Sequence, residues 1–176
     1  IQFRRVYAAA PVGIFIGLAL LMWLDPTISS AILGLVLVIY CVVTITQPAF
    51  RLPTALGRHL EIPVGFTTGL VNGVTGSQVM PVLPYLLSLQ LDRNIFVQAI
   101  NISFTISSGV FAIGLAWVGF FTFDTTQISF VGLVAMLVGL KLGIPIRQRL
   151  SQSSFRRAVL GLLMLLGAGL ILQPLL

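Results

Sequence analysis

Long apolar runs, each near the length of a bilayer-crossing helix, constrain this chain more than any other feature. A transmembrane helix needs about 20 consecutive, mostly apolar residues. Of the 176 residues, 57% are hydrophobic and 8% are charged, whereas soluble proteins carry about 25% charged residues. The sequence therefore predicts an all-α polytopic membrane protein. Five full spans are expected, at residues 6–24, 28–46, 94–121, 128–144 and 156–173.

The scarce polar residues exclude several classes of function. The chain has one histidine and one cysteine, Cys41, so neither a Cys/His metal site nor a disulfide framework is expected. The net charge of +6 would suggest nucleic-acid binding in a soluble protein. Here the basic residues flank the spans, where topology and lipid headgroups explain them. We expect no enzyme activity, no catalytic residue, no cofactor and no nucleic-acid partner.

One apolar segment, residues 62–90, is a poor helix. Within the membrane, non-helical backbone is tolerated only where it is buried in protein or lines a water-filled cavity. Transporters place such interrupted helices at their substrate-binding sites. We expect a re-entrant hairpin, or two short half-helices, that turns near residues 72–78. Glycines interrupt its first half and prolines its second, at Gly65, Gly69, Gly73, Gly76, Pro81 and Pro84. Uncharged polar residues lie between them, at Asn72, Thr75, Ser77 and Gln78.

The distribution of Lys and Arg favours a segment that returns to its starting side. Basic residues accumulate on the cytoplasmic side of a membrane. A single crossing would divide the Lys and Arg residues between both sides, whereas a return places all of them inside. The outer loops would then carry only Asp25 and Asp124, with Trp23 and Trp117 at the outer interface. We expect a multi-pass protein of the cell membrane, the inner membrane of a bacterium, with its basic loops in the cytoplasm.

A faint internal repeat predicts an inverted-repeat transporter fold. Residues 1–50 would be two helices at the end of a first repeat, and residues 62–176 a second repeat. The first repeat would lack its own hairpin, so we expect a longer protein or a homodimer to complete it. The matching pieces are Gly17-Leu18-Ala19-Leu20 with Gly139-Leu140-Lys141-Leu142, Leu33-Gly34-Leu35 with Leu160-Gly161-Leu162, and Gln47-Pro48 with Gln173-Pro174.

The region from Gly65 to Ala99 contains spaced glycines, then an apolar stretch with Pro81, a charged turn at Asp92-Arg93 and a helix. In this order of features the chain resembles the second half of the sulfite exporter family TauE/SafE. The resemblance implies a transporter of small sulfur-containing anions such as sulfite or organosulfonates. The family's first Gly-rich segment is absent from this sequence. The residues concerned are Gly65, Gly69, Gly73 and Gly76, then Pro81, Leu83 to Leu86, Leu91-Asp92-Arg93-Asn94-Ile95-Phe96 and Gln98-Ala99.

Two groups of residues are candidates for binding the anion. At the hairpin tip, helix ends, free N–H groups and the neutral side chains of Asn72, Thr75, Gly76, Ser77 and Gln78 could hold an oxyanion. The alternative is that the glycines only allow close packing. The second group is a polar stripe along the next span, whose residues recur at three- and four-residue steps. We expect Asn101, the second residue of this stripe, to lie nearest the tip. The stripe consists of Gln98, Asn101, Thr105 and Ser108.

Other polar residues have simpler interpretations. The alternative role of the stripe is to hold helices together by hydrogen bonds between them. Ser103 and Ser107, which lie off the stripe, are expected to be packing residues. Glu61, His59 and Asp92 are expected to be solvated loop residues at the inner surface. We therefore predict an exporter that works by alternating access around the hairpin tip. The alternative function is a non-transporting membrane scaffold or regulatory subunit.

Overall fold

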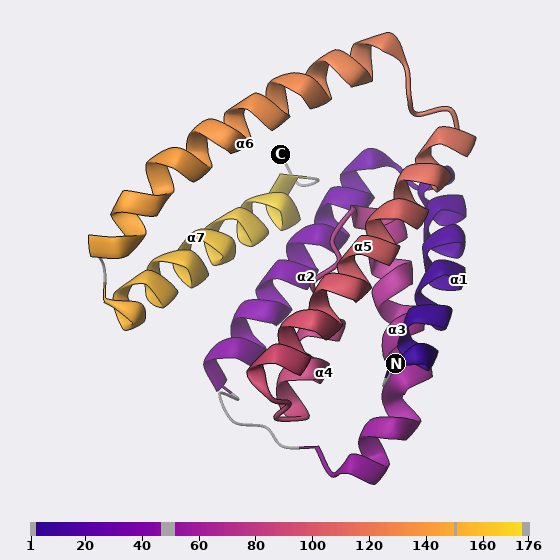
Figure 1. Ribbon diagram of the computed structural model, residues 1–176. Coiled ribbons are helices and arrows are strands. Elements are labelled where there is room, and N and C mark those ends of the chain that lie inside the picture. Colours follow the sequence, from indigo (N-terminus) through magenta and orange to yellow (C-terminus); the bar gives the residue numbers. More distant parts are fainter. Residues whose placement is uncertain (1–2, 47–51, 150, 174–176) are drawn as a thin grey trace.

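The chain is helical throughout the part that the structure describes. The computed structural model describes residues 3–46, 52–149 and 151–173, in which seven helices and no strand are found (Figure 1). The helices are α1 (Arg4–Leu21), α2 (Pro26–Thr46), α3 (Thr54–Thr75), α4 (Val82–Ser88), α5 (Arg93–Trp117), α6 (Phe123–Arg149) and α7 (Gln152–Leu172). The prediction of an all-helical membrane protein is confirmed at this level.

Four helical stretches of the described chain are long and apolar enough to cross a membrane. They are Arg4–Leu21, Pro26–Thr46, Arg93–Trp117 and Phe123–Ile144, and the apolar part of α7, Arg157–Leu172, is shorter. Helices therefore lie at all five predicted spans, but only four reach the length of a full span. Two pieces of the predicted repeat, Gln47-Pro48 and Pro174, lie outside the described residues. Arg51, one of the basic residues expected in the cytoplasmic loops, also lies outside them.

The turn between α1 and α2 follows from two residues. Asp25 accepts hydrogen bonds from the backbone N–H of Thr27, at 2.9 Å, and from its hydroxyl. Pro26 occupies the first helical position, where its missing N–H costs nothing. Hydrogen bonds from the Thr27 side chain and backbone lower the pKa of the exposed Asp25 carboxyl below its ordinary value.

The first half of the Gly-rich segment is a continuous helix, which corrects our prediction that glycines break it. α3 runs for 22 residues through Pro63 and the three glycines up to Thr75. It begins at Thr54, so His59 is helical rather than part of a loop. The glycines do not interrupt α3 because they form its contact with α1.

The contact between α1 and α3 is made by backbone against backbone. A methyl group on Gly65 would lie 2.9 Å from Val6 Cα, and one on Gly69 would lie 3.0 Å from Ala10 Cα. Only glycine permits such an approach. Pairs further along the two helices continue the series, with Gly73 against Ile14 and Gly17. Since both numberings rise together, α1 and α3 are parallel.

α5 runs in the same direction as α1. The Tyr7 hydroxyl donates a hydrogen bond to the Ala99 carbonyl at 3.2 Å, and further along both helices Leu18 packs on Gly114. α1, α3 and α5 therefore all start at one end of the molecule. Because α3 and α5 are parallel, the chain between them must return to the end at which α3 began.

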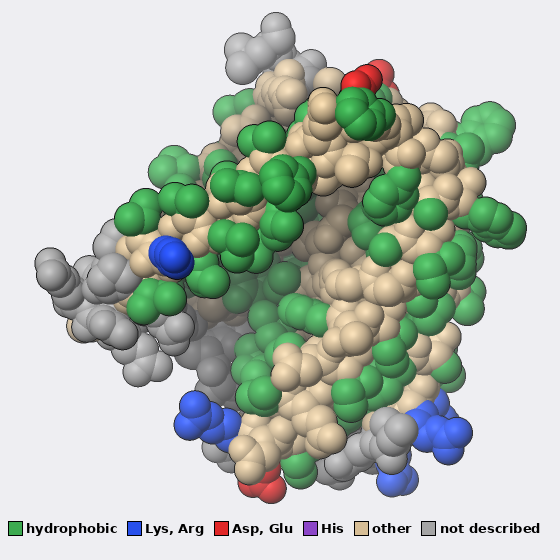
Figure 2. All heavy atoms as spheres, turned by 45° about the horizontal axis from the view of Figure 1, so that its top comes forward, with side chains coloured by type: hydrophobic (Ala, Val, Ile, Leu, Met, Phe, Trp, Pro, Cys, Tyr) green, Lys and Arg blue, Asp and Glu red, His purple; other side chains and the backbone are tan. Residues whose placement is uncertain are grey.

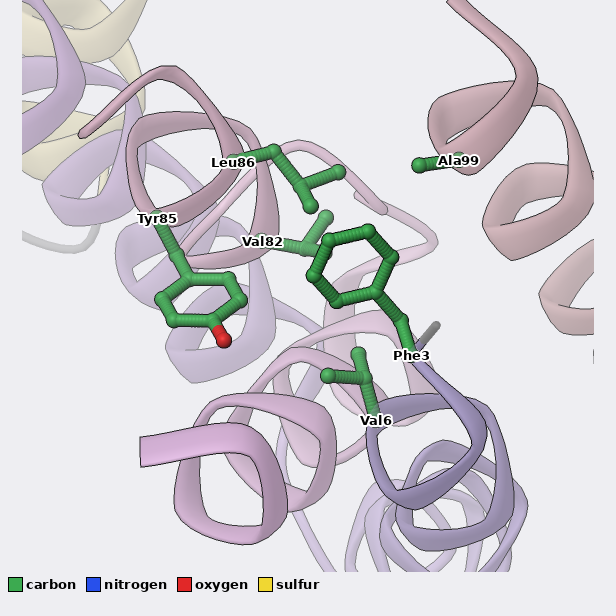
Figure 3. Packing of buried hydrophobic residues seen from close by; sticks show 6 residues of the cluster. All are labelled: Phe3, Val6, Val82, Tyr85, Leu86 and Ala99. Atoms are coloured by element: carbon green, nitrogen blue, oxygen red, sulfur yellow. The ribbon is translucent and has the colours of Figure 1, made fainter. Parts of the chain in front are cut away.

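The return is visible at the base of the segment. The Leu52 N–H donates to the Ser88 carbonyl at 3.0 Å, and the Tyr85 hydroxyl donates to the Gly57 carbonyl at 2.9 Å. α4 thus ends beside the start of α3. A buried cluster from α1 and the residue before it, from α4 and from α5 fills this base (Figure 3) and consists of Phe3, Val6, Val82, Tyr85, Leu86 and Ala99.

The remaining helices lie outside this group. α2 and α7 pack antiparallel, with Gly34 against Gly167 and the Cys41 thiol 3.5 Å from the Leu160 carbonyl. Every side chain of α6 from Phe123 to Ile144 is exposed, on all faces of the helix. Figure 2 shows hydrophobic side chains along the surface of this helix. An apolar helix exposed on every face is suited to contact with lipid or with another membrane segment.

Candidate functional site

The tip of the hairpin is the break at Gly76. Gly76 has a φ of 73°, a left-handed conformation that favours glycine, and its N–H donates to the Asn72 carbonyl at 2.7 Å. The Ser77 N–H donates to the Thr75 hydroxyl at 3.2 Å. The tip therefore receives the C-terminal end of α3. This corrects part of our expectation, because the carbonyls at a helix C-terminus do not attract anions. Donors at the tip must come from side chains and from the non-helical backbone.

Asn72 is the most unusual side chain at the tip. It is 0% exposed, and among the described residues neither its amide nitrogen nor its amide oxygen has a hydrogen-bond partner. Thr68, one turn earlier on the same face, is also buried, and its hydroxyl donates to the Val64 carbonyl at 2.7 Å. Buried polar groups in folded proteins are nearly always paired, so an orphaned amide indicates strain, a ligand or ordered water.

The tip and the polar stripe of α5 meet at one hydrogen bond. Gln78 Nε2 donates to the Ser108 hydroxyl oxygen at 2.7 Å, and the Gln78 amide oxygen is buried without a partner among the described residues. The residue of the stripe at the tip is therefore Ser108. Our prediction that Asn101 lies nearest the tip is wrong, since Asn101 is about 10 Å further down the α5 axis.

The tip lies within the middle part of α5. Ser108 is about 22 Å along the helix from Arg93 and about 14 Å from Trp117, at 1.5 Å per residue. Trp117 and Trp23 are 88% and 90% exposed and lie at the end of the molecule opposite to Arg4 and Arg93. An anion held beside Gln78 and Ser108 would be well separated from both ends of the helix.

The predicted site residues occupy different environments. Asn72 is buried; Thr75, Ser77 and Gln78 are half-buried; Gly76 is exposed. The four stripe residues, Gln98, Asn101, Thr105 and Ser108, are all exposed on α5. The inner face of α5 instead carries Ser103 and Ser107, both buried, in agreement with their expected packing role.

Glu61 departs from its expected place. It lies within α3 and is only 8% exposed, so the expectation of a solvated loop residue is wrong for this carboxylate. Its position could have been read from spacing, because seven and eleven residues separate it from Thr68 and Asn72, which puts the three on one helix face. The Tyr85 hydroxyl is its electrostatic neighbour. His59 and Asp92 are exposed, as predicted.

Comparisons with known proteins identify the family of this chain. Within the described part of the chain, no three His, Cys, Asp or Glu side chains gather as metal ligands would. The sequence matches the family described as Sulfite exporter TauE/SafE over residues 2–170, which includes α1 and α2 as well as the Gly-rich segment. Comparison with curated proteins and with solved structures gave no match. With a family match over nearly its whole length, the chain belongs to the sulfite exporter TauE/SafE family of membrane transporters.

Proposed function

We propose that this protein is a secondary transporter that exports small sulfur-containing oxyanions such as sulfite or organosulfonates. The family supports transport of sulfur anions. The observation that carries the assignment to a site is the fully buried, unpaired amide of Asn72, one turn before the break at Gly76. An orphaned amide offers both donors and an acceptor to a ligand.

The segment from α3 to α4 is proposed to enter and leave the membrane on the cytoplasmic side. The parallel directions of α3 and α5 support this, as does the hydrogen bond between Leu52 and Ser88 at its base. Arg4, Arg5 and Arg93 lie at the same end of the molecule as that base, and Figure 2 shows basic side chains along its lower edge.

Binding is proposed to use neutral donors at the tip. The substrate would lie beside Asn72 and the turn through Gly76, Ser77 and Gln78, with Thr75 and Ser108 completing its surroundings. Gln98, Asn101 and Thr105 would line the route from the cytoplasm. Weak coordination by neutral groups suits a carrier, because the anion must leave again. Alternating access would then expose the tip to each side in turn.

The test is anion exchange in proteoliposomes with the full protein. Asn72→Leu replaces the amide by an apolar group of similar size, which should keep or raise the stability of the fold because an unpaired buried polar group is removed. Sulfite and methanesulfonate exchange should be lost in this variant. Gln127→Leu, which removes an exposed amide on α6, should exchange both anions like wild type.

Each result has a definite reading. Exchange at the wild-type rate by folded Asn72→Leu protein would remove Asn72 from the site. Absence of exchange by wild type with every sulfur oxyanion would instead favour the scaffold or regulatory function.

A second experiment tests the path of the hairpin. In a Cys41→Ser background, single cysteines replace Asp124, Gln90 or Arg58, all of which are exposed. A membrane-impermeant maleimide should label only the Asp124 variant in intact cells and all three after permeabilisation. Labelling of the Gln90 variant in intact cells would show that the segment crosses the membrane.

A further inference from the structure

We infer that the hairpin tip accepts singly charged oxyanions and rejects doubly charged ones. This inference rests on the proposed transport function and narrows the class of substrate. It follows from the charge of the buried polar residues and from the place of Glu61 among them.

The buried polar side chains of the described chain include no cation. They are Glu61, Thr68, Asn72, Ser88, Ser103 and Ser107, of which only Glu61 carries a carboxyl group. The arginines whose side chains are described, Arg4, Arg5, Arg58, Arg93 and Arg157, are all exposed. Arg93 is separated from Ser108 by about 22 Å along α5. An anion at the tip would be stabilised by neutral donors alone.

Neutral donors favour a low substrate charge. The Born cost of moving an ion from water into a medium of low dielectric constant rises with the square of its charge, so a dianion costs about four times as much as a monoanion of the same size. Stabilisation by fixed neutral dipoles rises only in proportion to the charge. A site of neutral amides and hydroxyls at mid-depth therefore discriminates against dianions, which are usually held by Arg or Lys.

Glu61 adds to this discrimination. It lies on the same face of α3 as Thr68 and Asn72, about 16 Å from Asn72 along the helix axis. In its ionised form it repels a dianion twice as strongly as a monoanion. At an effective dielectric constant of about 20, the extra repulsion of a dianion corresponds to about a fivefold difference in affinity. Tyr85, the titratable neighbour of Glu61 on α4, is neutral near pH 7.

Sulfite provides a natural probe, because it exchanges between hydrogensulfite, a monoanion, and sulfite, a dianion, near neutral pH. A site that takes monoanions should carry hydrogensulfite only. Methanesulfonate is a monoanion and sulfate a dianion throughout this range of pH. The three anions therefore separate the effect of substrate charge from any effect of pH on the protein.

The experiment measures exchange of the three radiolabelled anions by wild-type protein in proteoliposomes, from mildly acidic to mildly alkaline pH. Protein-free vesicles give the background from passive leakage. We expect methanesulfonate exchange that does not change with pH, sulfite exchange that falls about tenfold per unit on the alkaline side, and no sulfate exchange. Sulfate exchange as fast as that of methanesulfonate, or sulfite exchange independent of pH, would overturn the inference while leaving transport intact.

Two further outcomes test the transport function itself and the role of Glu61. If wild type exchanges none of the three anions above background, the proposed function fails, and the inference falls with it. In Glu61→Gln protein, the affinity for sulfate relative to methanesulfonate, measured by competition, should rise about fivefold at neutral pH. An unchanged ratio would remove Glu61 from charge selection.

Discussion

Replacing Gly69 by alanine should separate α1 from α3. The added methyl group would lie 3.0 Å from Ala10 Cα and 2.9 Å from the Ala10 carbonyl carbon, both of which are backbone atoms that cannot rotate away. Overpacking of this kind costs about 1–3 kcal/mol. Alanine regains up to about 1 kcal/mol of helix propensity. Taking the upper value for a backbone clash, we expect a net loss of about 2 kcal/mol in the free energy of unfolding.

The matched control is Gly109→Ala on α5. No atom lies within 4 Å of the position that its methyl group would take, so the propensity gain should appear alone. Both variants would be unfolded with SDS in mixed micelles and followed by circular dichroism. If Gly69→Ala protein is as stable as wild type, or if Gly109→Ala protein loses as much stability, the close packing of α1 on α3 is not what makes glycine necessary.

Three smaller predictions follow from single contacts. A double-mutant cycle with Gln78→Ala and Ser108→Ala should give a coupling of about 0.6 kcal/mol, typical of hydrogen bonds between membrane helices, and additive losses would show that the bond does not form. The Asp25 carboxyl should titrate below its ordinary pKa, so that its stabilising contribution is present at neutral pH and is lost as pH falls through that lowered value. In NMR titration Thr27→Val should move the pKa back up. Cys41, fully buried between α2 and α7, should resist thiol reagents until the protein unfolds, so labelling of the native protein would contradict the packing of α2 on α7.

The positions of the long helices could be predicted from the sequence because they depend on local hydropathy. The apolar runs are bounded by charged or turn-forming residues, such as Asp25 with Pro26, and these boundaries need no knowledge of the tertiary fold. The break at Gly76 is predictable for a similar reason, since a left-handed residue at a helix end favours glycine.

The continuity of α3 could not be predicted from local propensity. Gly65, Gly69 and Gly73 weaken an isolated helix, and only the approach of α1 shows why they stabilise this one. For the same reason the sequence does not identify the residue of α5 that lies at the tip. Residue spacing along α5 defines the stripe. Which of its residues contacts Gln78 depends on the path that the chain takes after Gly76, and spacing does not give that path.

The backbone contact between α1 and α3 also limits how this protein can move. Side chains that interdigitate can change rotamer and let two helices slide, whereas glycines in contact with backbone have no such freedom. A shift of α3 by a single residue would bring Phe66 or Leu70 to the places where Gly65 and Gly69 now meet α1. Steric contact therefore opposes a small slide of one helix on the other. A step of four residues, about 6 Å along the helix, would instead bring Gly69 and Gly73 to the places where Gly65 and Gly69 now meet α1. The spacing of the glycines therefore favours movement in whole helical turns over a gradual slide.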